Sequence, residues 1–277
     1  MGLFPALCCL AALAVLAPAR ADTPVAAEPD PWRQAAELEY AAAHATFAHR
    51  AEAGSASARL GQALTLLNLA PKTRDSIARA EAMLSALSEP EIDPAVRVTA
   101  RYFLGRVAQV HRYEPDWELA AARFHDLWQD HPQSPLAQMG VVKLALLWLY
   151  EVVDTAERRE RFARLEAIGP MLTHEPARRD FHYVMGVAYL NHAGDPRDAL
   201  RHFLACETVG VRQRRTLSYL YLRIAELARM TDQPELARRY YTRFTTHFPY
   251  DSRVNLARAR LATLATGAEG PLDPRGD

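Results

Sequence analysis

The sequence is poor in cysteine and lysine, carries no net charge, and has no apolar run long enough to span a bilayer. Basic and acidic residues balance at 33 each, and only Lys72 and Lys143 are lysine. Nucleic-acid binding needs clustered excess cation, so the composition argues against it. Of three cysteines, Cys8 and Cys9 lie near the amino terminus. Cleavage of the amino-terminal segment would remove both and leave Cys206 without a partner for an intrachain disulfide. We therefore expect Cys206 to be a buried packing residue.

The amino terminus has the pattern of a cleaved export signal. An apolar run from Leu7 to Leu16 is too short to cross a membrane, and the small residues of Ala19-Arg20-Ala21 follow it. No Lys or Arg precedes the run. The pattern predicts a signal peptide over residues 1–21, a mature chain beginning at Asp22, and a periplasmic or secreted protein with no membrane span.

Motifs that carry chemistry are missing. There is no glycine-rich phosphate loop and no Gly-x-Ser-x-Gly nucleophile elbow. The ten histidines are not spaced three or four residues apart, as two metal ligands on one helical face would be. We therefore expect these histidines on the surface or in turns. The sequence predicts no catalytic residues, no metal site, no cofactor and no enzymatic activity.

One spacing returns five times along the chain: a small residue, an aromatic or small residue four positions later, and a proline eight positions beyond that. In the third instance Arg158 replaces the small residue, and in the fourth Val211 replaces the proline. The instances are Ala78-Ala82-Pro90, Ala120-Phe124-Pro132, Arg158-Phe162-Pro170, Ala199-Phe203-Val211 and Ala237-Tyr241-Pro249. Each follows a Leu-Gly-like pair: Leu60-Gly61, Leu104-Gly105, Leu144-Ala145, Met185-Gly186 and Ile224-Ala225. Such repetition indicates a repeat architecture.

Prolines divide the chain into pairs of helices. Pro71, Pro115, Pro196 and Pro234 separate the two helices of a pair, and most pairs close on a further proline. No segment alternates apolar and polar residues for long enough to indicate a strand. The sequence thus predicts an all-α fold.

These residues resemble the tetratricopeptide repeat (TPR), which has Leu-Gly on its first helix and Ala, Phe and Pro on its second. The last unit matches best, with sixteen residues from Ala225 to Tyr241 and eight from Tyr241 to Pro249. Successive units are 39 to 44 residues apart instead of the thirty-four of the consensus. The resemblance implies a right-handed α-solenoid of about five repeats with capping helices at its ends.

The predicted organisation places the repeat array between two less regular ends. A disordered leader covers residues 22–31 and one helix covers residues 32–54, either capping the array or filling its groove. The array covers residues 55–266, and a disordered tail covers residues 267–277. The repeats are placed at 55–92, 95–133, 135–172, 176–211 and 213–250, with a capping helix at 251–266.

In this architecture the repeated aromatics are structural. Gly or Ala on the first helix lets the second helix approach closely, and Phe or Tyr fills the space between pairs. Any binding surface should then lie on the first helices. The predicted groove residues are Tyr102, Arg106, Gln109, Met139, Val142, Leu146, Leu149, Tyr183, Val187, Leu190, Tyr219, Leu222, Glu226 and Arg229. An exposed apolar strip of this kind indicates peptide binding. Alternatively, tight winding or the 32–54 helix buries it.

The turn from His131 to Ala137, His-Pro-Gln-Ser-Pro-Leu-Ala, resembles a connection in bacterial envelope repeat proteins. These include the outer-membrane barrel-assembly lipoprotein and the periplasmic protein of the Tol-Pal system. The resemblance implies a periplasmic scaffold that binds protein or peptide partners in envelope assembly or maintenance. Two alternatives stay open: a repeat domain that serves an envelope-remodelling enzyme, and a protein that self-associates, for instance as a homodimer, through the same strip.

Overall fold

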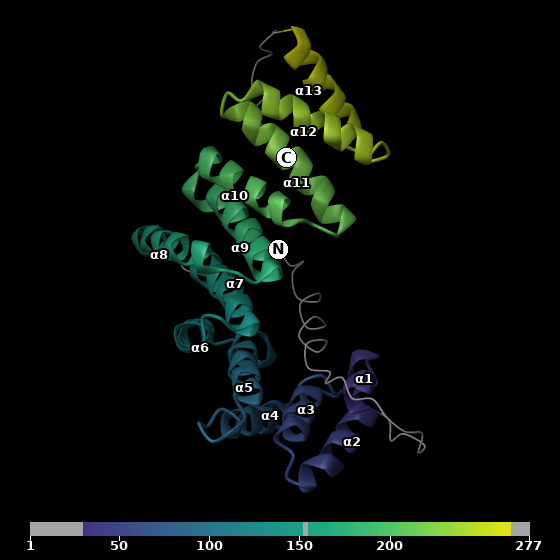
Figure 1. Cartoon of the computed structure of the whole chain (residues 1–277), viewed down its shortest axis with the longest axis vertical. Helices are drawn as coiled ribbons and strands as arrows, with labels where there is room; N and C mark the ends of the chain where they lie inside the picture. Colours follow the sequence, from purple (N-terminus) through teal and green to yellow (C-terminus); the bar gives the residue numbers. More distant parts are fainter. Residues whose placement is uncertain (1–29, 152–154, 267–277) are drawn as a thin grey trace. The chain divides into compact units, whose positions relative to one another are not determined.

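The computed structural model describes residues 30–151 and 155–266, and every regular element in these ranges is helical (Figure 1). The predicted all-α class is confirmed. The predicted signal peptide and tail, and residues 22–29 of the predicted leader, lie outside the described residues. Within the described ranges, thirteen α-helices pack in consecutive TPR-like pairs. The chain forms two compact units, one ending at Leu144 and the other beginning at Ala145, so the boundary falls inside α7.

Unit 1 contains three helix pairs and the first part of α7. The π-helical turn η2 extends the end of α5. The elements are α1 (Pro31–Ala36), α2 (Tyr40–Glu52), α3 (Ala56–Leu66), α4 (Arg74–Ala86), α5 (Pro94–Arg106), η2 (Val107–His111), α6 (Trp117–Asp130) and α7 (Pro135–Tyr150).

Unit 2 contains the rest of α7, five further α-helices that continue the alternation of first and second helices, and the terminal helix. The elements are α8 (Thr155–Ile168), η3 (Gly169–Met171), α9 (Glu175–Ala188), η4 (Tyr189–Ala193), α10 (Pro196–Val209), α11 (Arg214–Met230), α12 (Pro234–His247) and α13 (Val254–Thr266). The last helix lies within the predicted capping segment.

Aspartate followed by proline starts three of the helices, α1, α5 and α10. The Asp93 carboxylate accepts hydrogen bonds from two backbone N–H groups in the first turn of α5, and Asp195 does the same for α10. In each case proline occupies the first helical position, where its missing N–H leaves no hydrogen bond unmade.

Close packing of glycine against phenylalanine joins the helices within a pair. A Cβ atom on Gly105 of α5 would come within 2.6 Å of the Phe124 ring on α6, and one on Gly186 of α9 within 2.8 Å of the Phe203 ring on α10. Both rings are fully buried. These glycines are needed because any side chain there would overlap the aromatic ring.

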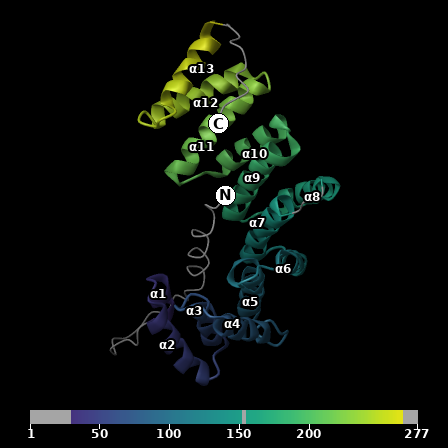
Figure 2. The same cartoon turned by 180° about the vertical axis from the view of Figure 1, so that it is seen from behind.

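The segment predicted as one helix over residues 32–54 is two helices, α1 and α2. Leu38 between them has a left-handed φ of 68°, which ends the first helix. α2 packs along α3 (Figure 2), and its Phe47 ring lies against Gly61. Ala43 and Phe47 are both buried and four residues apart, so α1 and α2 form a short additional pair. The Ala43–Phe47 spacing was the signal for it in the sequence.

The register predicted for the first repeat is wrong on its second helix. Ala78 and Ala82 of α4 are exposed, whereas Ala80 and Leu84 are fully buried. The small-then-large spacing of four residues is therefore kept but lies two residues further along. The predicted register was set by the spacing to Pro90. That spacing does not hold here, because the turn after α4 is longer than the repeat pattern requires.

Two π-helical turns account for part of the extra length of the repeats. η2 follows α5 and η4 follows α9, each before the turn to the second helix. Nineteen residues separate Gly105 from Phe124 and seventeen separate Gly186 from Phe203, against sixteen in the last unit. The added residues widen the end of the first helix and leave the close contact of the pair intact.

Candidate binding surface

The predicted groove residues of unit 1 belong mostly to its core. Tyr102, Arg106 and Val142 are buried, and Gln109 and Met139 are half-buried. The ring of Tyr102 packs edge-on against Phe103 at 5.4 Å between centroids, and the Arg106 guanidinium donates a hydrogen bond to the Gln109 side chain. These side chains hold the unit together and offer little surface to a partner.

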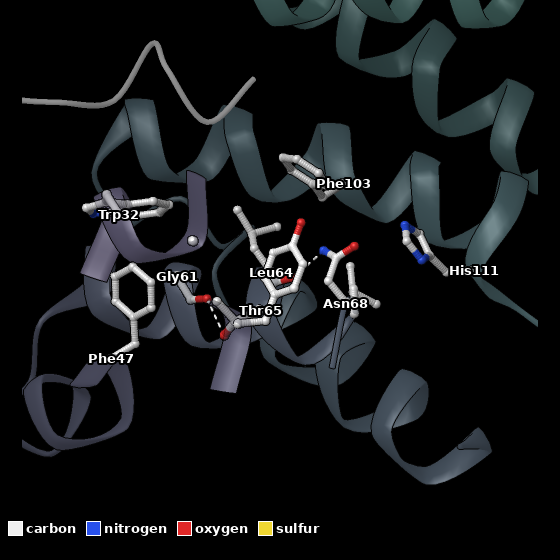
Figure 3. A pocket seen from close by; sticks show the side chains of 11 residues that line it. Trp32, Phe47, Gly61, Leu64, Thr65, Asn68, Phe103 and His111 are labelled. Carbon is white, nitrogen blue, oxygen red and sulfur yellow. Dashed lines mark hydrogen bonds between the residues drawn. The ribbon is translucent and has the colours of Figure 1, made fainter. Parts of the chain in front are cut away.

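A small pocket in unit 1 lies between the added N-terminal pair and the first helices that follow it (Figure 3). Trp32 and Phe47 close one end, and Phe103 and His111 lie at the other. Its volume is about 20 Å³, which is room for about one water molecule. Burial, together with the positive charges of Lys72 and Arg106, lowers the pKa of His111 to about 4. The pocket is a packing gap between helices and is too small for a peptide side chain.

In unit 2, the predicted groove residues are less covered. Leu149 and Leu222 are buried, whereas the remaining seven are half-buried. Those seven are Leu146, Tyr183, Val187, Leu190, Tyr219, Glu226 and Arg229. None of the nine is fully exposed, so the apolar strip is shallower than the sequence suggested.

Glu226 and Arg229 are occupied inside the unit. The Glu226 carboxylate accepts a hydrogen bond from the hydroxyl of Tyr241 on α12 and pairs with Arg229 at 3.2 Å. Burial and then the bond to Glu226 raise the pKa of Tyr241. These two predicted groove residues therefore fix α11 to α12, and their charged groups are not available to bind a partner.

Three tyrosines, each from a different first helix, gather on unit 2. We call Tyr150 (α7), Tyr183 (α9) and Tyr219 (α11) the tyrosine cluster. The rings of Tyr183 and Tyr219 lie 6.2 Å apart between centroids, and Tyr150 lies edge-on to His192 at 5.0 Å. All three are half-buried. The cluster is a partly accessible aromatic surface that joins three successive helix pairs.

Two phenols of the cluster, those of Tyr150 and Tyr183, stay neutral over a wide pH range. Burial raises the pKa of Tyr183 to about 12, with a further contribution from Tyr219. Burial also raises the pKa of Tyr150, and Tyr183 and Tyr219 add to the effect. At neutral pH each hydroxyl can donate or accept a hydrogen bond while its ring packs against an apolar group. Tyr150 was not among the predicted residues, although it directly follows Leu149.

Arginines border the tyrosine cluster on α11. Arg215, Tyr219 and Arg223 follow one another at four-residue intervals and so share one face of the helix. Arg215 and Arg223 are exposed, and the Arg223 guanidinium lies 5.1 Å from the centre of the Tyr219 ring. Neither makes an ion pair with a carboxylate of the described residues.

The acidic residues of the neighbouring helices have partners elsewhere. Asp180 on α9 pairs with Arg179 at 2.8 Å, and Asp251 pairs with Arg253 at 2.7 Å. Arg214, next to Arg215, donates a hydrogen bond to the His247 carbonyl of α12 and lies over the Phe248 ring at 5.0 Å. The face that carries Arg215 and Arg223 is therefore positively charged and open.

Two histidines predicted to lie on the surface or in turns are instead brought together between helices. The Nδ1 atoms of His182 on α9 and His202 on α10 are 2.9 Å apart, and His202 is 1% exposed. Nε2 of His202 is 2.8 Å from the Glu166 carboxylate of α8, which also accepts hydrogen bonds from Tyr189 and Arg201. Helical spacing along one segment did not reveal this pair, because each residue comes from a different helix.

The electrostatics of this network favour a neutral His182 and a charged Glu166 carboxylate. Burial alone would raise the pKa of Glu166, but hydrogen bonds from His202, Arg201 and Tyr189 outweigh it and lower the pKa to about 2. Burial, with His202 and Arg201, lowers the pKa of His182 to about 4. The network ties α8, α9 and α10 together.

Other expectations about chemistry can be checked on the described residues. Cys206 is a buried free thiol, as predicted, and burial raises its pKa to about 12. No group of three or more His, Cys, Asp or Glu side chains in the described ranges is arranged to hold a metal ion. Within those same ranges, no helix is both long and apolar enough to cross a bilayer.

Comparison with known proteins adds one likeness of fold. No protein-family model matches the sequence, and no curated protein matches it. Among solved structures, the chain is similar to a thermophilic TPR protein of Thermus thermophilus, with 15% sequence identity and a TM-score of 0.43. The match covers 76% of this chain and 100% of that one.

Proposed function

We propose that the protein is a non-enzymatic scaffold that binds a protein or peptide segment on the first helices of unit 2. The observation that carries the proposal is the tyrosine cluster. Half-buried tyrosines offer large contact area at low entropic cost, because each side chain has few rotatable bonds and is already held in place. Three of them on successive first helices suit an extended ligand that crosses several helix pairs.

The same proposal gives the repeated aromatics of the second helices a purely structural role. Phe124, Phe203 and Tyr241 on these helices are fully buried. They position the first helices and touch no ligand. The His182–His202–Glu166 network likewise serves packing, since it lies between α8, α9 and α10 and joins them by hydrogen bonds.

We further propose that the chain acts in the bacterial envelope, on the support of the signal-peptide pattern and of the turn from His131 to Ala137 alone. Fractionation of a cell that expresses the tagged full chain would test this. We expect the protein in the periplasmic fraction with a new amino terminus at Asp22. An uncleaved chain that stays in the cytoplasm would contradict the proposal.

A displayed library of random twelve-residue peptides, selected on the purified protein, tests the binding function. The dissociation constant of the most enriched peptide is then measured for the wild type and for a Tyr183→Ala, Tyr219→Ala double variant. Loss of two aromatic contacts, each worth about 0.5–1.5 kcal/mol, is expected to weaken binding about tenfold or more.

The control is Tyr250→Ala, which removes a tyrosine that is 98% exposed on the turn before α13. It should bind the peptide as the wild type does. A Tyr183→Phe, Tyr219→Phe variant keeps both rings and guards against a loss that comes from misfolding. Equal affinity of the wild type and the alanine double variant, or no enriched peptide at all, would refute the proposed surface.

A further inference from the structure

The charge of the carboxyl-terminal part of unit 2 points to the chemistry of its partner. From Pro196 to Thr266 the sequence has thirteen arginines and six Asp or Glu residues, a net charge of +7. Residues 30–144 of unit 1 have twelve basic and fourteen acidic residues, a net charge of −2. The neutral total therefore hides a basic carboxyl-terminal region, and the tyrosine cluster borders that region.

Two of the arginines are placed to contact a ligand of the tyrosine cluster. Arg215 and Arg223 are exposed on either side of Tyr219, on the same face of α11. The carboxylates of Asp180 on α9, of Glu226 on α11 and of Asp251 in the turn before α13 pair with Arg179, Arg229 and Arg253. Arg223 lies over the Tyr219 ring, and its charge also acts on the Tyr183 phenol. A planar guanidinium supported by a ring suits bidentate bonding to a carboxylate.

We propose that the ligand of the tyrosine cluster is an acidic segment of another protein, whose two carboxylates pair with Arg215 and Arg223. The inference rests on the proposed function and adds the class of partner to it. Between the carboxylates, an apolar or aromatic side chain packs on Tyr219 and Tyr183.

The helix sets the spacing of the two acids. Eight residues of α-helix separate Arg215 from Arg223, a rise of about 12 Å. An extended peptide covers about 3.3 Å per residue, so the matching acids are about four positions apart. The pairs lie at the surface and are screened by salt, so the affinity should fall as ionic strength rises.

The peptide selection described above also tests this inference. We expect the enriched peptides to have Asp or Glu at two positions about four residues apart. Replacing both acids of the best peptide by Asn or Gln should weaken binding about tenfold or more, as should an Arg215→Gln, Arg223→Gln double variant of the protein. An Arg239→Gln, Arg258→Gln variant removes the same charge from exposed positions on α12 and α13, and should bind within about twofold of the wild type.

The other outcomes each decide a different point. In one outcome the enriched peptides carry no excess of Asp or Glu and bind the arginine double variant as tightly as the wild type. That result would refute the proposal of an acidic partner and would leave the proposed function standing. If no peptide is enriched over the Tyr183→Ala, Tyr219→Ala variant, both fail. Sedimentation of the protein alone gives the last outcome: a dimer that Arg215→Gln, Arg223→Gln dissolves would show that a second copy, and not a different protein, occupies the face.

Discussion

The two units use the same helix pairs but expose different first-helix faces. In unit 1, Tyr102, Arg106 and Val142 are buried, and the added pair of α1 and α2 packs on α3. In unit 2, half-buried tyrosines and exposed arginines occupy the corresponding helices. The same pairing of a first and a second helix thus produces a packed face in one unit and a candidate binding face in the other. The spacing shared by all repeats says nothing about which of the two a repeat will form.

The largest expected effect tests whether the two units have equivalent cores. Phe124→Ala in unit 1 and Phe203→Ala in unit 2 each remove a fully buried ring that faces a glycine. Each change should destabilise its own unit by about 3–5 kcal/mol, since a large cavity is left behind. Urea unfolding followed by hydrogen exchange would measure the loss and locate it. A cost below about 1 kcal/mol in either unit would show that the pairs are not built alike.

Adding a single methyl group tests the close approach of the helices. Gly105→Ala and Gly186→Ala bring a Cβ atom within 2.6 Å and 2.8 Å of a buried ring. We expect a loss of about 1–2 kcal/mol, because overpacking exceeds the gain in helix propensity. Gly140→Ala on α7 is the matched control, since its nearest contact would be 3.3 Å. Thermal denaturation should rank Gly140→Ala as the most stable of the three variants.

A pH titration of stability tests the His182–His202–Glu166 network of unit 2, and His111 of unit 1, whose pKa is also lowered to about 4, should add a fall over the same pH range. The pKa of folded His182, about 4, lies below the ordinary 6.5, so the unfolded state binds the proton first. Stability should therefore fall as the pH drops from about 6.5 to 4. Glu166, with a folded pKa of about 2, adds stability above its ordinary pKa of 4.5 that is lost as the pH falls towards 2.

His182→Asn should flatten the part of this profile between pH 6.5 and 4. His49→Asn is the control, because that side chain is 80% exposed on α2. Urea midpoints measured at half-unit pH intervals would provide the profile. Parallel profiles for the wild type and His182→Asn would mean that His182 is not held neutral in the folded protein.

The smallest expected effect concerns the register of α4. Ala82→Glu should change stability by no more than about 0.5 kcal/mol, because the side chain is exposed. Ala80→Glu, two residues earlier, would bury a carboxylate without a partner and should be strongly destabilising. The opposite ranking in thermal denaturation would restore the register that the proline at position 90 suggested.

Local spacing was enough to predict the helical class, the pairing of helices and the structural aromatics from Phe124 onward. It failed where the geometry depends on neighbours. The α4 register was misaligned because turn length varies, and the α1–α2 pair was overlooked although Ala43 and Phe47 have the repeated spacing. The His182–His202 contact joins residues twenty positions apart on two helices, so no single helical face reveals it.

The candidate site was predictable only in outline. Tyr183 and Tyr219 follow from projecting the repeat, but their half-buried state depends on how adjacent first helices pack. Glu226 and Arg229 looked available in the sequence, and hydrogen bonds across to Tyr241 show that they are not. The positive charge beside the cluster became visible only when the charges of residues 196–266 were counted apart from those of the rest of the chain.

Hydrogen–deuterium exchange of the full chain with the selected peptide tests the central claim most directly. The account predicts slower exchange in α9 and α11, over residues 175–192 and 212–230, and at the end of α7. Exchange in α3 and α5 of unit 1 should stay unchanged. Protection confined to unit 1, or to the second helices α10 and α12, would contradict the assignment of the binding face to the tyrosine cluster.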